Sequence, residues 1–527
     1  MSRLSAEAHR IATDASLDER QRRAQLARLA ESTIKPMTLR AGTWMLLDKG
    51  VLCDLFEGPA PARPRYVLPD YARALRQGCA WLELEAPRAF DEALSFLSIL
   101  YQHVPSVTGY PVWLGHVDSL LEPFAADLDD TQLNRQLRLF WRALDRCLPN
   151  AFVHANLGPE PSRVGRAILQ LERELRQVVP NLSLLVDPTR TPDAFLLEAI
   201  QCCFDSAKPH FVNHPLVSRA FERPNAERPV AAHPYGVASC YNSLPVGGGS
   251  YTLVRLNLAR AAEHFDGSIA TFLDEELPRL VEAGCELLAA RSRYAVEQSP
   301  FFGHNGSGPA HFLVAEGLVQ QERFGAMFGL LGMAELCNSL LAREYPMRKP
   351  RYGRHREGGE LGQRVLARLV ELIAEHPIPH CSFNQGRAWL HAQSGIDSDQ
   401  GSTPGTRIPF DDEPELLEHL RAIAPMHAPF EAGASDPLRL DSTVRQNPRA
   451  VLELMRGAFS TGLRDFTFDL ADSELMRVTG YLVRRSELPK LGQSALRHDS
   501  TLLSGGAVRE RKLLERSARR VTGPNGL

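Results

Sequence analysis

The sequence lacks a long uninterrupted hydrophobic stretch. Its longest strongly apolar run without a charged residue spans residues 324–334, which is 11 residues, whereas a membrane-spanning helix needs about 20. The first 32 residues carry charges throughout and contain no hydrophobic centre of a secretory signal. We therefore expect a cytoplasmic protein that does not contact a membrane.

The sequence also has no excess of charge of one sign. Lys and Arg number 60 against 63 Asp and Glu, which gives a net charge of −3, and 44% of the 527 residues are hydrophobic. A protein that binds nucleic acid through a basic face would be more positive, and a disordered chain would be less hydrophobic. The composition is therefore that of a globular protein with no nucleic-acid partner.

Cysteine is scarce, and its spacing does not suit a metal site. The nine cysteines are scattered along the chain, and none forms a C-x-x-C pair. An odd, scattered set argues for free thiols, and the lack of paired cysteine knuckles argues against structural zinc. The H-E-x-x-H and EF-hand patterns are absent as well. We expect no bound metal.

Amphipathic helical stretches alternate with short apolar runs, which is typical of an α/β protein. Pro- and Gly-rich connections separate these elements rather than two compositionally different halves, so one large domain is favoured. The expected helices are residues 17–33, 87–103, 130–148, 162–178, 193–205, 268–290, 323–342, 359–375 and 447–460. The expected strands are residues 151–155, 182–186, 211–213, 251–258 and 464–468.

The most informative segment is SELMRVTGYLV, residues 473–483. Its Arg-Val-x-Gly-Tyr pattern resembles the radical loop of glycyl radical enzymes. A stored carbon radical must be planar at Cα, and any side chain would crowd that geometry, so only glycine meets the demand without steric cost. The apolar neighbours of Gly480 would bury it. The alternative is a plain turn glycine between two strands.

A glycyl radical needs a cysteine partner, because the radical passes to a thiol that then takes hydrogen from the substrate. Cys240 is the best candidate, since it lies in YGVASCYN, residues 235–242, before the glycine run 247–249 and an apolar strand. A cysteine among small residues suits a loop that projects into a closed cavity. The alternative is a buried, inert thiol.

One pair of cysteines competes for this role, and a further cysteine is a candidate second thiol. The adjacent pair Cys202 and Cys203 resembles the catalytic pair of pyruvate formate-lyase, but its neighbours have amphipathic helical spacing, which favours a packing role. Cys79 lies in QGCAW, residues 77–81, where a second thiol could donate hydrogen or form a transient disulfide with Cys240.

Together these segments resemble the class III anaerobic ribonucleotide reductases and, more specifically, the YjjI-type branch of glycyl radical enzymes. The shared segments are PSVTGYPVWLGHVD, residues 105–118, and RVTGYLVR, residues 477–484. The resemblance covers most of the chain from about residue 50. It implies an α/β fold in which a ten-stranded barrel, made of two five-stranded halves, is surrounded by helices. The implied parts are a helical extension (1–45), the barrel with the Cys240 finger loop (46–440) and the glycyl radical segment (441–527).

The departures from the reductases narrow the function. No cysteine lies between Cys381 and Gly480, where the reductases carry four zinc-binding cysteines. Fewer than 50 residues precede the barrel, so a nucleotide-binding regulatory cone is missing. Ser250-Tyr251-Thr252 stands where the reductases have Asn-Leu-Gly in contact with substrate, which argues against a ribonucleotide substrate.

The resemblance also implies the site and its partners. Gly480 would store the radical, Cys240 would become the thiyl that abstracts hydrogen from a small polar substrate, and Cys79 would be the second thiol. Ser250, Asn257 and His427 would contact substrate. A separate activating enzyme that uses S-adenosylmethionine and an iron–sulfur cluster would install the radical under anaerobic conditions. A homodimer is compatible with this family.

The sequence leaves the reaction open, because a thiyl radical serves reductases, dehydratases and lyases alike. One alternative is an anaerobic ribonucleotide reductase that has lost both zinc and cone. Another is a non-catalytic α/β binding module in which Gly480 is only a turn residue.

Overall fold

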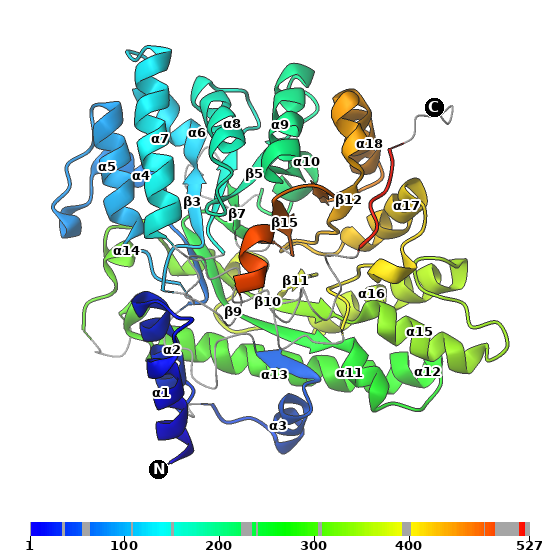
Figure 1. The fold of residues 1–527 in the computed structure, drawn as a ribbon. Coiled ribbons are helices and arrows are strands. Elements are labelled where there is room, and N and C mark those ends of the chain that lie inside the picture. The colour runs from blue at the N-terminus through cyan, green and yellow to red at the C-terminus, as the bar shows by residue number, and fades with distance from the viewer. Residues whose placement is uncertain are drawn as a thin grey trace.

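The computed structural model describes residues 2–33, 37–54, 64–106, 109–148, 152–222, 234–238, 241–303, 308–392, 402–478, 480–490 and 516–521. Two five-stranded sheets form its centre. In Figure 1, helices α7, α8 and α9 line the upper part of the molecule and α13, α11 and α15 the lower part. Within the described ranges, no helix combines the length and the apolar character that a membrane span requires.

The first sheet has the strand order β13-β6-β5-β4-β3. Four of its strands are parallel, and β13 runs antiparallel to β6. Its strands are β3 (Trp113–His116), β4 (His154–Leu157), β5 (Asn181–Val186), β6 (His210–Asn213) and β13 (Asp465–Phe466). The helices between them are α6 (Val117–Leu121), α7 (Asp130–Cys147), α8 (Arg163–Leu175), α9 (Asp193–Ser206) and α10 (His214–Ser218). The amphipathic stretches expected at 130–148, 162–178 and 193–205 are thus confirmed.

The second sheet has a parallel centre of β9, β10 and β11, with β1 and β2 antiparallel to β9 on its other edge. Its strands are β1 (Leu52–Asp54), β2 (Tyr66–Leu68), β9 (Gly248–Asn257), β10 (Phe324–Leu331) and β11 (Trp389–His391). The helices that follow in this half are α11 (Leu258–Glu263), α12 (Ile269–Thr271), α13 (Leu277–Arg293), α14 (Phe312–Ala315), α15 (Met333–Glu344) and α16 (Arg356–Glu375).

The helix expected over residues 323–342 is wrong in its first half. The chain forms strand β10 there, and α15 begins only at Met333. Every residue of β10 is buried, because β9 and β11 flank it and side chains cover both faces. A strand buried on both faces shows no alternation of polar and apolar residues, so its sequence resembles that of a buried helix.

Two hairpins and several further helices complete the fold. The expected strand 464–468 divides between β13 and β14, which pair with different strands. The hairpins are β7 (Tyr235–Ala238) with β8 (Asn242–Pro245), and β15 (Leu475–Arg477) with β16 (Leu482–Arg484). The other strands are β12 (Leu438–Leu440) and β14 (Phe468–Leu470). The other helices are α1 (Arg3–Thr13), α2 (Glu19–Glu31), α3 (Ala41–Asp48), α4 (Tyr71–Gln77), α5 (Phe90–Tyr101), α17 (Leu416–His427) and α18 (Pro448–Ser460).

The segment 516–521 pairs with the edge of β12 that follows Arg439. The backbone N–H of Arg519 donates to the carbonyl of Arg439 at 3.0 Å, and the N–H of Asp441 donates to the carbonyl of Arg519 at 2.9 Å. The guanidinium of Arg516 forms a buried ion pair with Glu413 at 2.5 Å. β12 therefore pairs both with β14, before the β15–β16 hairpin, and with this segment after it.

Candidate functional site

Gly480 lies in the tip of the β15–β16 hairpin. Arg477 pairs with Leu482, and the N–H of Val478 donates to the carbonyl of Tyr481 at 3.2 Å, so the turn is tight. Gly480 is buried. In Figure 1, the β15 label lies near the middle of the molecule, between the upper and lower helices.

Two side chains from the first sheet hold the carbonyl of Gly480. His154 Nε2 lies 3.0 Å from this oxygen, and the side-chain amide of Asn181 donates to it as well. His154 and Asn181 are direct neighbours at the start of β4 and β5. Burial lowers the pKa of His154 to about 3, so the ring is neutral. A neutral ring that faces a carbonyl must carry its proton on Nε2 to donate a hydrogen bond.

Arg477 connects the glycine hairpin to its surroundings. Its guanidinium donates to the hydroxyl of Tyr241 at 3.2 Å and to the carbonyl of Ala207. Its backbone N–H donates to Asp469 at 3.1 Å. Because Tyr241 directly follows Cys240 in the sequence, this guanidinium joins the hairpin that carries Gly480 to the hairpin that carries Cys240.

The β7–β8 hairpin lies against the first sheet. The side chain of Asn156 accepts from the N–H of Val237 at 2.8 Å and donates to its carbonyl at 2.9 Å. At Gly236, an added Cβ would lie 2.4 Å from the ring of Trp113, so only glycine permits this close packing. Cys240 and Ser239 lie outside the described residues. Direct transfer of hydrogen predicts that the Cys240 sulfur and Gly480 Cα lie within about 4 to 6 Å of each other.

Tyr241, which directly precedes β8, is held in an unusual backbone conformation. Its backbone has the left-handed φ of 67°, which is uncommon for a residue with a side chain. Gly433 passes so close that an added Cβ would lie 2.0 Å from the carbonyl oxygen of Tyr241. The Tyr241 ring meets His210 edge to face, with centroids 4.5 Å apart. The residue after Cys240 is therefore held by the close approach of Gly433 and by the ring of His210.

A small cavity adjoins both strands of the β7–β8 hairpin. Its lining residues come from β6, α10, this hairpin and two later segments of the chain. They are Val212, Val217, Val237, Tyr241, Ser243, Gly433, Ala434, Arg464 and Asp465. About 10 Å³ is open to the centre of a water molecule, which is room for about one water.

Asp465 and His210 form a buried pair beside this cavity. His210 Nε2 lies 3.5 Å from Asp465 Oδ2, and Ser435 Oγ donates to Asp465 Oδ1 at 3.1 Å. Burial raises the pKa of Asp465 well above its usual value and lowers the pKa of His210 well below its own. Burial therefore disfavours the charged form of both groups.

The residues expected from the sequence to contact substrate lie in several places. Ser250 Oγ donates to the carbonyl of Thr252 at 2.9 Å within β9. Asn257 caps α11 and accepts from Ser402 Oγ at 3.1 Å. His427 is buried at the end of α17, 3.3 Å from Asp436, and its Nδ1 accepts from the N–H of the cavity residue Arg464 at 3.4 Å. His427 is therefore one hydrogen bond from the cavity.

The other cysteines singled out by the sequence have described positions. Cys202 and Cys203 lie in α9, as their spacing predicts, and both are buried. Cys203 Sγ donates to the carbonyl of Phe468 at 3.5 Å. Cys79 pairs through its backbone with Leu84, and its thiol interacts with Glu316. Burial raises the pKa of this thiol.

Sequence reasoning missed most of the polar side chains around Gly480 and the cavity. They are His154, Asn156, Asn181, His210, Arg464 and Asp465. One signal could have found three of them: His154, Asn181 and His210 are each the first residue of an otherwise largely apolar strand. Polar residues at the same end of neighbouring parallel strands meet at one edge of the sheet.

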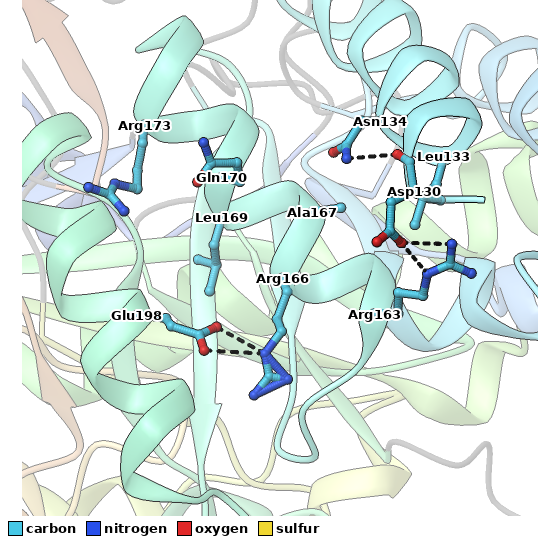
Figure 2. Close-up of a pocket in the computed structure, with 10 residues that line it drawn as sticks. All are labelled: Asp130, Leu133, Asn134, Arg163, Arg166, Ala167, Leu169, Gln170, Arg173 and Glu198. Atoms are coloured by element: carbon cyan, nitrogen blue, oxygen red, sulfur yellow. Dashed lines mark hydrogen bonds and ion pairs between the residues drawn. The ribbon is translucent and has the colours of Figure 1, made fainter. Parts of the chain in front are cut away.

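A groove on the outer surface differs in character from this site. It lies among α7, α8 and α9 and has a volume of about 370 Å³. Figure 2 shows two of its ion pairs: Arg163 contacts Asp130, and Arg166 contacts Glu198 at 3.0 Å. Arg173 pairs with Asp205 at 2.9 Å. None of its lining residues lines the cavity beside Tyr241. Its charges are therefore satisfied within the protein.

Comparison with known proteins matches nearly the whole chain to one family. A family model described as "Glycyl radical enzyme YjjI-like" matches residues 17–519. The protein YjjI of Escherichia coli K12 is 44% identical over 519 residues, covering 98% of this chain and 97% of its own length. A protein of Haemophilus influenzae is 36% identical over 503 residues, covering 94% of this chain and 93% of its own length.

Solved structures share the fold at low sequence identity. The B12-independent glycerol dehydratase from Clostridium butyricum, in its glycerol-bound form, has a TM-score of 0.72 at 13% identity, with 98% of this chain and 88% of that chain covered. The anaerobic ribonucleotide reductase from Thermotoga maritima, in complex with dATP and CTP, has a TM-score of 0.69 at 11% identity, with 93% and 94% covered.

Proposed function

Because the chain belongs to the YjjI-like family of glycyl radical enzymes, we propose that Gly480 stores the radical and Cys240 relays it to a small polar substrate. The observation that carries this proposal is the meeting of the two hairpins. Gly480 lies at the tip of one, and Tyr241, which follows Cys240, accepts a hydrogen bond from the other through Arg477.

The surroundings of Gly480 support radical storage. A glycyl radical is stabilised by electron release from the amide nitrogen and electron withdrawal into the carbonyl. Hydrogen bonds from His154 and Asn181 to that carbonyl strengthen the withdrawal, and burial strengthens both bonds. The two donors are neutral, so they add no charge beside the radical.

The relay moves one hydrogen atom in each step. The thiol hydrogen of Cys240 passes to Cα of Gly480, which leaves a closed-shell glycine and a thiyl radical. The thiyl then takes a hydrogen atom from a carbon of the substrate and leaves a substrate radical. Cys79 is proposed as a second thiol that returns hydrogen to the product or pairs with Cys240.

The proposed architecture joins the two sheets. Each has five strands, and we propose that they are the halves of a ten-stranded barrel around the two hairpins. A closed barrel would exclude water and oxygen from the radicals. The proposed parts are the extension 1–45, the barrel 46–440 and the radical segment 441–527.

The family implies activation by a partner enzyme. We propose that this partner uses S-adenosylmethionine and an iron–sulfur cluster to remove hydrogen from Gly480 under anaerobic conditions. The proposal needs no metal bound to this chain. Ser250, Asn257 and His427 remain proposed substrate contacts, and His427 has the most direct link to the cavity.

The test is electron paramagnetic resonance after anaerobic activation. The wild-type protein should give a doublet, because the one remaining hydrogen on Gly480 Cα splits the signal. Gly480→Ala should give none. Transfer into D₂O should collapse the doublet, since the thiol of Cys240 exchanges its hydrogen with solvent and returns deuterium to Gly480.

Cys240→Ala separates storage from relay. This variant should give the doublet and keep it in D₂O. The doublet could instead collapse at the wild-type rate in Cys240→Ala but persist in D₂O in Cys79→Ala or Cys203→Ala. That result would assign the relay to the other cysteine. A verified activase that produces no doublet in the wild-type protein would contradict radical storage.

A further inference from the structure

The segment 516–521, drawn in red in Figure 1, is seated in a site formed by earlier parts of the chain. The Arg516 guanidinium donates to both oxygens of Glu413, and these two side chains are only 5% and 6% exposed. The same guanidinium stacks on the ring of Phe410, 4.0 Å from its centroid, and donates to the carbonyl of Pro437 at 2.8 Å. Burial and two parallel hydrogen bonds make this ion pair stronger than an exposed one.

Arg519 is the second anchor of the segment. Its guanidinium lies 2.5 Å from Nδ1 of His419 and 3.4 Å from Glu413. Because an arginine only donates hydrogen bonds, Nδ1 of His419 is the acceptor and this ring is neutral. Burial lowers the pKa of His419, which agrees with a neutral ring. Ser517 and Arg520, in contrast, are exposed. The segment is therefore held by two arginines while one side of it faces solvent.

The segment also serves as the third strand of a small sheet. β12 and β14 have three residues each. Arg519 lies parallel to β12, opposite Leu440, and forms backbone hydrogen bonds with the residues on either side of it. A pair of short strands is marginally stable by itself, and a third strand adds hydrogen bonds and covers an open edge. Loss of the segment would therefore weaken the pairing of β12 with β14.

This small sheet holds the base of the β15–β16 hairpin. Ala471, which follows β14, donates its N–H to the carbonyl of Leu440 at 3.1 Å. The carbonyl of Ala471 accepts from the guanidinium of Arg439 in β12 at 3.2 Å and from that of Arg485, which follows β16, at 3.0 Å. Both ends of the hairpin that carries Gly480 are therefore bonded to the sheet that the segment completes.

We propose that residues 516–521 are a latch on this hairpin. Docked beside β12, the latch keeps Gly480 buried, and its release loosens the small sheet so that the hairpin can open toward the activating enzyme. This inference rests on the proposed function, because it assigns the regulation of the same site. Local opening of a surface segment costs less free energy than disruption of either five-stranded sheet. The latch can therefore be released while the rest of the fold stays intact.

The test measures amide hydrogen exchange by mass spectrometry in the unactivated protein, so it does not depend on the radical. In a chain that ends at residue 515, residues 475–484 should exchange at least about 10-fold faster than in the 527-residue chain. Exchange in β10, which belongs to a five-stranded sheet, should be the same in both proteins. Unchanged exchange of the hairpin would overturn the proposal. Equal acceleration in β10 would indicate a general stabilising role and would also overturn it.

Point variants test whether the docking contacts are responsible. Arg516→Gln and Glu413→Gln should each speed exchange of the hairpin, and the double variant should exchange no faster than the truncated chain. Arg520→Gln is the matched control, because this arginine of the same segment is exposed, and its hairpin should exchange at the wild-type rate. Acceleration in Arg520→Gln equal to that in Arg516→Gln would assign the effect to the net charge of the segment and would overturn the latch.

The rate of radical formation tests the regulatory role. With the activating enzyme in excess, the truncated chain should give the doublet faster than the 527-residue chain and reach the same final yield, because opening precedes removal of hydrogen. Equal or slower formation would overturn the latch, while the doublet itself would still support radical storage. Absence of the doublet in both proteins would contradict radical storage, and hydrogen exchange would still decide on the latch.

Discussion

The guanidinium of Arg477 and the hydroxyl of Tyr241 form a hydrogen bond of 3.2 Å between the two hairpins. Arg477 precedes Gly480 by three positions, and Tyr241 follows Cys240 directly. The contact is buried and involves a charged donor, which makes it stronger than a neutral hydrogen bond. The two segments that are proposed to carry the radical are thus aligned by residues outside the proposed relay.

Tyr241→Phe should slow radical transfer without preventing radical storage. The change removes only the hydroxyl that accepts from Arg477, so the yield of the doublet should match the wild type. Collapse of the doublet in D₂O should slow by about 10-fold, which corresponds to about 1.4 kcal/mol. Tyr352→Phe is the control, because Tyr352 donates to the carbonyl of Thr406. Equal collapse rates in all three proteins would contradict this role.

Activated protein brought into air should break at Gly480. Oxygen combines with the glycyl radical at Cα, and the backbone is cleaved there, which releases a piece of about 47 residues (527 minus 480). Mass spectrometry would detect this fragment. Cys240→Ala should be cleaved too, whereas Gly480→Ala and unactivated protein should remain whole. Ordinary proteolysis of an exposed tail would cut all four samples.

His154 should make the protein sensitive to acid. Burial lowers its pKa from 6.5 to about 3, so between these values the unfolded chain binds a proton that the folded protein does not. Its contribution to stability is therefore full above about pH 6.5 and is lost as the pH falls toward 3.

His154→Gln isolates this effect because the other titrating groups remain. Between about pH 7.5 and pH 5, the wild type should lose about 2 kcal/mol more unfolding free energy than this variant, as measured by urea denaturation. His9→Gln changes an exposed histidine of α1 and should follow the wild type. Parallel curves for wild type and His154→Gln would refute the neutral assignment.

The ion pair between Lys208 and Glu172 should be essential for stability. Both side chains are fully buried, their charged atoms lie 2.7 Å apart, and Trp141 donates to the same carboxylate oxygen at 2.6 Å. Lys208→Met leaves the carboxylate unpaired and should cost about 3 to 5 kcal/mol in urea denaturation.

The double variant Lys208→Met with Glu172→Leu tests the reason for that loss. Removing both charges should restore more than half of the lost stability, because no unpaired charge remains. Arg138→Met breaks an exposed pair with Glu174 and should cost less than about 1 kcal/mol. If the double variant were less stable than Lys208→Met, packing rather than charge would dominate.

The sequence predicted the α/β class, most helices and the family, because these depend on local periodicity and on short motifs. It failed where burial removes the periodic pattern, as in β10, where eight consecutive residues are buried. It also failed at the polar residues around Gly480. His154 and Asn181 are adjacent only because β4 pairs with β5 in one register, and a single sequence does not encode that register in any local pattern.

The cavity residues illustrate the same limit. Arg464 and Asp465 follow α18 in a stretch that the sequence predicts as a strand (464–468), but this pattern does not indicate that their charged side chains are buried. Their burial arises because β13 adds to the edge of β6, where Asp465 lies opposite Val212. Long-range strand pairing, which the sequence pattern does not reveal, therefore places these two charged residues in the lining of a buried cavity.

The pairing of β12 with both β14 and the segment 516–521 limits how Gly480 can become accessible to another protein. The hairpin lies between two stretches of chain that both pair with β12, one through β14 (Phe468–Leu470) and the other through Arg519. It is therefore a loop tied at both ends and not a free arm. An activating enzyme would have to draw the hairpin out as a doubled strand, or first detach the tie at Arg519 and its ion pairs with Glu413.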